Sequence, residues 1–120
     1  MSDSISSLLS SVRSFADARN WEQFHSPKNL SMALIVEAGE LVEHFQWMSE
    51  QESRTLSPSQ REEVALEMAD VLIYLCRLSD RLDIDLLAAA QKKMRLNEEK
   101  YPVKRARNNR MKYTAWKGEE

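Results

Sequence analysis

The scarcity of turn-forming residues is the feature that most constrains what this chain folds into. Its 120 residues contain only two glycines, Gly39 and Gly118, and three prolines, Pro27, Pro58 and Pro102. A β-sandwich or β-barrel needs many more turns, and dinucleotide or P-loop phosphate sites need glycine-rich turns. The length is that of one ordinary domain. The sequence therefore predicts a single all-α domain.

Apolar residues recur at helical spacing in four segments. We expect helices over residues 5–19, 29–48, 58–82 and 86–100, joined by short connectors. Ser57-Pro58 is a typical helix start, with serine as the N-cap and proline in the first helical position. Short connectors favour antiparallel neighbours, and the third helix is long for so small a domain. We therefore expect a four-helix bundle that packs into a homo-oligomer, with a single elongated bundle as the alternative.

The single cysteine and the absence of a long apolar run indicate the compartment in which the protein works. Cys76 is the only cysteine, so it forms no internal disulfide, and its apolar neighbours predict a small core residue in a reducing compartment. No run of 18 apolar residues occurs, which predicts a cytoplasmic protein with no membrane partner.

Residues 104–120 carry six Lys or Arg and two Glu, whereas the whole chain has a net charge of −2. We expect this basic tail either to bind phosphates or to pair with an acidic surface. Because it lacks a recognition motif for nucleic acid, we expect no nucleic-acid partner.

Pairs of acidic residues interrupt the apolar stripes of the second and third predicted helices. Glu37 and Glu40 lie about 60° apart around one helix, and Glu67 and Asp70 have the same spacing on the next. A buried carboxylate without a partner is costly, so each pair needs a cation or a proton. Residues 30–48 contain no Lys or Arg. Four converging carboxylates favour Mg²⁺, with Mn²⁺ as the second candidate, over zinc or copper.

Other interpretations of these acids stay open. A di-iron bundle uses Glu-x-x-His motifs, and the second members here are Glu40 and Asp70, which disfavours iron. Acid pairs also occur on solvated helix faces, or bind a structural metal or bridge an interface in a non-catalytic helical dimerisation module. Gly39, between the first two acids, costs about 1 kcal/mol relative to alanine in a helix. Close approach of another helix, or of a ligand, would explain it.

An ordered set of motifs resembles one known family. The acidic pairs stand as Glu37-Ala38-Gly39-Glu40 and Glu67-Met68-Ala69-Asp70, and the other matching segments are residues 21–25, 27–30, 45–47, 70–75, Lys93 with Asn97, 100–102 and 112–114. This order resembles the MazG-like, all-α nucleoside triphosphate pyrophosphohydrolases, and within them the dCTP pyrophosphatase branch. The resemblance extends from about residue 15 to residue 114.

The resemblance implies Mg²⁺-dependent hydrolysis of a nucleoside triphosphate to the monophosphate and pyrophosphate, as nucleotide-pool sanitation. It places the catalytic domain in residues 1–103 and the basic tail in residues 104–120. The implied metal ligands are Glu37, Glu40, Glu67 and Asp70; the implied substrate contacts are Trp21, Trp47 and Tyr74 for the base, His25 in the pocket, and Lys93, Asn97 and Tyr101 for phosphate or sugar. It also implies an oligomer, commonly a dimer of dimers, whose sites neighbouring subunits complete.

The chemistry of a triphosphate suggests roles for two of these residues. Glu40 is our candidate for the general base that takes a proton from water, and Lys93 supplies a movable positive charge that assists catalysis. Stacking on tryptophan tolerates any base, so selection among bases needs hydrogen bonds from groups such as His25, Asn29 or Gln46. Without the resemblance, Trp47 is simply a core or interface aromatic and His25 an ordinary connector histidine.

One position departs from the family pattern. Val12 stands where relatives of this branch can carry a polar pocket residue. The resemblance implies dCTP or a modified dCTP as the substrate, and this departure keeps dUTP, dATP or a damaged nucleotide open as the alternative.

Overall fold

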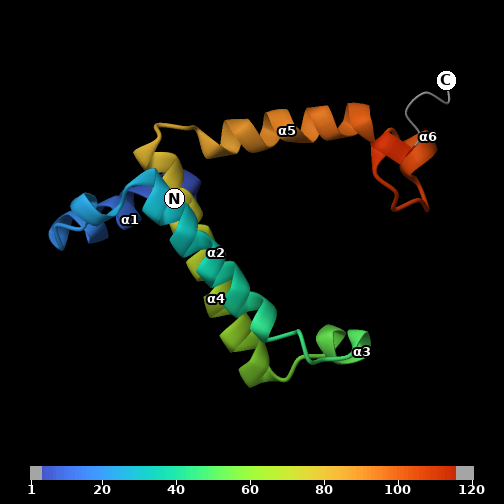
Figure 1. The fold of residues 1–120 in the computed structure, drawn as a ribbon, viewed down its shortest axis with the longest axis horizontal. Helices are drawn as coiled ribbons and strands as arrows, with labels where there is room; N and C mark the ends of the chain where they lie inside the picture. The colour runs from blue at the N-terminus through green and yellow to red at the C-terminus, as the bar shows by residue number, and fades with distance from the viewer. Residues whose placement is uncertain (1–3, 116–120) are drawn as a thin grey trace. The chain divides into compact units, whose positions relative to one another are not determined.

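A computed structural model describes residues 4–115, which form helices joined by turns (Figure 1). The four long helices are α1 (Ile5–Ala18), α2 (Pro27–Glu43), α4 (Pro58–Arg81) and α5 (Leu86–Lys100); the short ones are η1 (Glu22–Phe24), α3 (Glu50–Arg54), α6 (Val103–Ala106) and η2 (Tyr113–Ala115). Residues 4–115 contain no strand, which confirms the predicted all-α class. Lys117 of the predicted basic tail lies outside the described residues.

Helix α2 begins and ends earlier than predicted. The Ser26 hydroxyl accepts a hydrogen bond from the Asn29 backbone N–H at 3.1 Å, with Pro27 in the first helical position. This is the same Ser-Pro start that correctly predicted α4, where Ser57 caps the helix. Residues 44–47 continue as turns instead of helix. The prediction of a helix over residues 29–48 was therefore wrong at both ends.

The polar segment that follows contains a helix that the sequence analysis missed. In α3, the Ser49 hydroxyl accepts the Glu52 backbone N–H, and the Glu52 carboxylate accepts the Ser49 backbone N–H, each at 3.1 Å. This reciprocal capping satisfies two donors that a helix N-terminus otherwise leaves unpaired. A five-residue helix without apolar residues carries no periodic signal, so hydrophobic spacing could not reveal it.

The chain divides into two compact units, one ending at Ile84 and one beginning at Asp85. In the first unit, α2 and α4 run side by side in opposite directions, and α1 packs against α4 (Figure 1). In the second unit, the rings of Tyr101 and Tyr113 meet edge to face with centroids 5.9 Å apart. The predicted boundary between a catalytic domain and a basic tail, at residues 103 and 104, stays a prediction.

Little of the apolar surface of the first unit is buried within the chain. Its buried apolar residues are Ala16, Leu30, Val64 and Cys76, so the predicted core position of the cysteine is confirmed. By contrast, one face of α2 leaves most of its apolar surface exposed, at Met32, Ile35, Val36 and Val42.

Gly39 lies on this same face of α2. Apart from its two chain neighbours and the backbone of its own helix, no atom of the described chain lies within 4 Å of where its Cβ would be. Close approach of another helix of the same chain therefore does not explain this glycine.

None of the helices in residues 4–115 is long and apolar enough to cross a membrane.

Candidate active site

Four carboxylates from α2 and α4 converge. Oxygen atoms of Glu37, Glu67 and Asp70 all lie within 4.8 Å of one another. The charge of Glu40 acts on both Glu37 and Glu67, so its carboxylate belongs to the same acidic group. Two antiparallel helices thus bring together the four residues predicted as metal ligands. That these residues bind a metal stays a prediction.

The crowding of these acids changes their protonation. Desolvation, followed by the hydrogen bond and charge of Glu40, raises the pKa of Glu37 to about 7. Desolvation and the charge of Glu40 also raise the pKa of Glu67, and this is partly offset by His44, whose Nε2 lies 3.9 Å from Glu67 Oε1. Like charges held close together favour the neutral acid, so each of these groups gains from a nearby cation.

Two carboxylate oxygen atoms of this cluster are candidates for contact with a cation. Glu37 Oε2 and Glu67 Oε2 are buried and have no hydrogen-bond partner within residues 4–115. A buried polar atom without a partner costs free energy, and a hard divalent cation would satisfy carboxylate oxygens directly. The donor set consists of carboxylate oxygens, which Mg²⁺ and Mn²⁺ prefer and which zinc and copper sites rarely use alone. The residues present therefore fit Mg²⁺.

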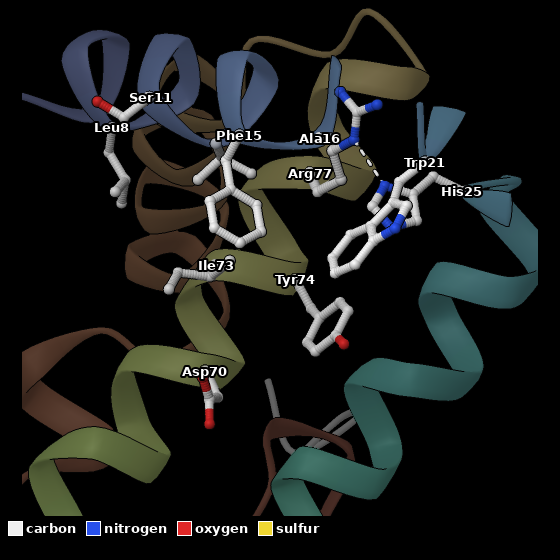
Figure 2. Close-up of a pocket in the computed structure, with 11 residues that line it drawn as sticks. Leu8, Ser11, Phe15, Ala16, Trp21, His25, Asp70, Ile73, Tyr74 and Arg77 are labelled. Atoms are coloured by element: carbon white, nitrogen blue, oxygen red, sulfur yellow. Dashed lines mark hydrogen bonds between the residues drawn. The ribbon is translucent and has the colours of Figure 1, made fainter. Parts of the chain in front are cut away.

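A pocket of about 410 Å³ lies against this cluster and is shared by α1, the η1 segment and α4 (Figure 2). Asp70 lines it at one end, and Trp21, His25 and Tyr74 contribute to its walls. The Trp21 ring meets His25 edge to face, with ring centroids 6.0 Å apart. A pocket of this size with a few polar groups is typical of small-molecule sites.

The pocket gathers three of the predicted substrate contacts, Trp21, His25 and Tyr74, next to a predicted metal ligand. Val12 also lines it, so the departure from the family pattern falls within the pocket wall. An apolar side chain there offers no hydrogen bond to a base.

The other predicted contacts lie elsewhere. Asn29 donates its Nδ2–H to the Phe24 carbonyl at 3.1 Å, which ties η1 to the start of α2. Trp47 is 89% exposed in the turn after α2, and neither residue lines the pocket. Lys93 and Asn97 lie on α5 and Tyr101 at its end, in the second unit. Their substrate contacts stay predictions.

One buried charge in the pocket wall was not predicted from the sequence. Arg77 is only 3% exposed and lines the pocket. Its Nε–H donates to His25 Nδ1 at 3.0 Å, and its Nη1–H donates to Asp80 Oδ2 at 3.1 Å. The available signal was an arginine within the apolar stripe of α4, between Cys76 and Leu78.

The fold and this site define an all-α protein with a carboxylate cluster beside an aromatic pocket. Residues 32–115 match the model of the MazG-like family. A solved structure of a pyrophosphatase from Archaeoglobus fulgidus aligns with a TM-score of 0.75 and 44% sequence identity, covering 79% of this chain and 89% of that one. The chain belongs to the MazG-like family, which confirms the predicted resemblance.

Curated relatives point to one branch of that family. Human dCTP pyrophosphatase 1 is 48% identical over 102 residues, and the Rattus norvegicus protein of the same name is 46% identical over 102 residues. Each match covers 83% of this chain and 60% of the relative. The chain thus spans about 60% of the length of these relatives.

Proposed function

We propose that this chain is a Mg²⁺-dependent nucleoside triphosphate pyrophosphohydrolase. It hydrolyses dCTP or a modified dCTP to the monophosphate and pyrophosphate, and so serves nucleotide-pool sanitation. The observation that carries this proposal is the position of Asp70, which belongs both to the carboxylate cluster and to the aromatic pocket. A nucleotide bound there has its base in the pocket and its phosphates at the carboxylates. The names of the human and archaeal relatives support the same activity.

The carboxylates supply the hydrolytic end of the site. Glu37, Glu40, Glu67 and Asp70 would hold the cation, with the unpartnered oxygens of Glu37 and Glu67 among its ligands. Bound Mg²⁺ supplies charge neutralisation for the triphosphate and for the leaving pyrophosphate. Glu40, which lies beside both Glu37 and Glu67, would accept the proton of the attacking water.

Lys93 would supply positive charge for phosphates. Lys93 and Lys100 both lie on α5, and the hydrogen bond and charge of Lys100 lower the pKa of Lys93. Neighbouring cations repel each other unless an anion lies between or beside them. This supports the predicted role of Lys93 as a phosphate contact that assists catalysis. We extend the sugar and phosphate contacts to Asn97 and Tyr101 on the family pattern.

We also propose that the chain works as a homo-oligomer, either a dimer or a dimer of dimers. The exposed apolar face of α2 supports this, because soluble monomers rarely leave such a face uncovered. Gly39 lies on that face and leaves room for close approach by a second chain. Sedimentation equilibrium at micromolar protein that gave the mass of a single chain would contradict this assembly.

A panel of nucleotides tests the activity. We expect pyrophosphate release from dCTP with Mg²⁺, and none after the metal is removed with a chelator. Val12 in the pocket wall favours keeping dUTP, dATP and a modified dCTP in the panel. Release concentrated on another dNTP would keep the chemistry and change the substrate. No release from any nucleotide would overturn the proposal in favour of a non-catalytic helical module.

Trp47→Ala tests whether this exposed aromatic residue contacts the substrate. Stacking on a base contributes about 1–3 kcal/mol, so we expect the KM for dCTP to rise about tenfold. Because Trp47 is 89% exposed, we expect an unchanged thermal unfolding midpoint. Steady-state kinetics and a thermal melt on the same preparation provide both values. An unchanged KM would assign Trp47 to an interface instead of the substrate site.

A further inference from the structure

Arg77 is a buried cation whose orientation is set from two sides. Its Nε–H donates to His25 Nδ1 at 3.0 Å, and its Nη1–H donates to Asp80 Oδ2 at 3.1 Å. Asp80 is itself held from α1, because Arg13 donates its Nε–H to Asp80 Oδ2 at 3.0 Å. The pKa of Asp80 is lowered by these two arginines, chiefly by the hydrogen bond from Arg13. The guanidinium plane of Arg77 is thereby fixed against the His25 ring.

This contact decides where the His25 ring carries its proton. Arginine N–H groups only donate, so His25 Nδ1 must accept and cannot be protonated. A neutral imidazole with an accepting Nδ1 carries its proton on Nε2. Burial, together with the charges of Arg77 and Arg81, also lowers the pKa of His25 and favours the neutral ring.

The proton on Nε2 is available to a ligand. Within residues 4–115, Nε2 of His25 has no hydrogen-bond partner, and the ring lines the pocket beside Trp21 (Figure 2). Most neighbouring side chains in the wall are apolar, among them Val12, Phe15 and Ile73. A single oriented N–H in apolar surroundings discriminates among ligands, because a mismatched partner leaves it unsatisfied.

We propose that Arg77 is a positioning residue that fixes His25 as a hydrogen-bond donor to an acceptor atom of the nucleobase. The acceptor is a carbonyl oxygen or an unprotonated ring nitrogen. This inference rests on the proposed function, since that function places a nucleotide in the pocket. It adds a residue on α4 that selects the base without touching it.

Arg81 provides a matched control on the same helix. It donates its Nε–H to the His25 carbonyl at 3.1 Å and its Nη1–H to Glu22 at 2.7 Å. Both arginines therefore hold the η1 segment against α4, but only Arg77 contacts the imidazole. The charged groups around His25 are these two arginines with their partners Glu22 and Asp80, and the ionisable groups across the pocket are Asp70 and Tyr74.

The tautomer of His25 is the direct test. Nitrogen-15 NMR of the intact wild-type chain is expected to show a neutral ring protonated at Nε2, and a His25→Gln variant assigns its signals against those of His44. Arg77→Met should give a mixture of tautomers, whereas Arg81→Met should keep the proton on Nε2. A wild-type ring protonated at Nδ1, or an Arg77→Met ring like that of wild type, would overturn the proposal. A wild-type ring protonated at Nδ1 would overturn the proposal even if Arg77→Met does not fold.

Kinetics then separate positioning from simple anchoring of the loop. We expect Arg77→Met to raise the KM for dCTP about 5- to 10-fold, with kcat changed by less than about twofold. Arg81→Met should leave KM unchanged, and the double variant His25→Ala/Arg77→Met should match His25→Ala alone. If Arg77→Met and Arg81→Met changed KM equally, Arg77 would only hold the η1 segment in place and would not position His25. Inactive wild-type protein would overturn the proposed function, while the NMR result would still decide the Arg77 contact.

Discussion

Replacing Asp70 by asparagine is expected to lower pyrophosphate release from dCTP by at least about 100-fold and to leave helical content unchanged. Among the described residues, Asp70 alone belongs to both the carboxylate cluster and the pocket. Asparagine keeps the size of the side chain but removes the charge that attracts a divalent cation. Initial rates with saturating Mg²⁺, together with far-UV circular dichroism, measure the two outcomes.

Two further variants test whether the loss of activity is specific to the carboxylate cluster. Glu37→Gln should lose activity to a similar degree, because it removes a second acid of the same cluster. Glu62→Gln is the matched control, since Glu62 is an exposed acid on α4 that lies outside the cluster. Full activity of Asp70→Asn would disprove the metal-site assignment. An equal loss in Glu62→Gln would show that general surface charge, and not this cluster, governs the rate.

The affinity of the free protein for Mg²⁺ should be about tenfold tighter at pH 8 than at pH 6. Glu37 has a pKa of about 7 in the metal-free fold, above its ordinary value, so it carries a proton at pH 6. Magnesium must displace that proton, and the free-energy cost of removing it disappears as pH rises above 7. The effect on folding has the opposite sign: the contribution of Glu37 to the stability of the metal-free protein is fully present below its ordinary pKa and is lost as pH rises through about 7.

Calorimetric titration of the protein with Mg²⁺ at pH 6, 7 and 8 measures this linkage. Buffers of different ionisation enthalpy report the released proton separately from the binding heat. The Glu37→Gln variant cannot release that proton and should bind Mg²⁺ more weakly with less dependence on pH. Equal wild-type dissociation constants at pH 6 and pH 8 would refute the protonated state of Glu37.

The helices that the sequence predicted well are those with both an apolar period and a clear cap. Helix α4 ends at Arg81, one residue before the predicted end, and α5 has the predicted bounds, capped by Asp85. Helix α2 was misplaced because the Ser26-Pro27 cap was overlooked. Its early end also changed the position of Trp47, since a residue in a turn no longer follows the helical period.

The candidate site also has one part that was predictable from the sequence and one part that was not. The four acids were predictable because residues three apart on a helix share a face wherever the helix lies. The pairing of His25 with Arg77 was not predictable, because it joins residues 52 positions apart. It depends on the path of the η1 segment across α4, which no local pattern in the sequence specifies.

The unbroken length of α4 has a consequence for how such a site changes over evolution. Asp70 and Arg77 lie on this one helix, two turns and about 10 Å apart. Both ends of the pocket are therefore fixed by the same rigid element, and their separation does not depend on any loop. Under the proposed function, substitutions near Arg77 or Val12 would alter which base is admitted while the carboxylates keep their spacing. New substrate preferences would then arise on an unchanged carboxylate cluster.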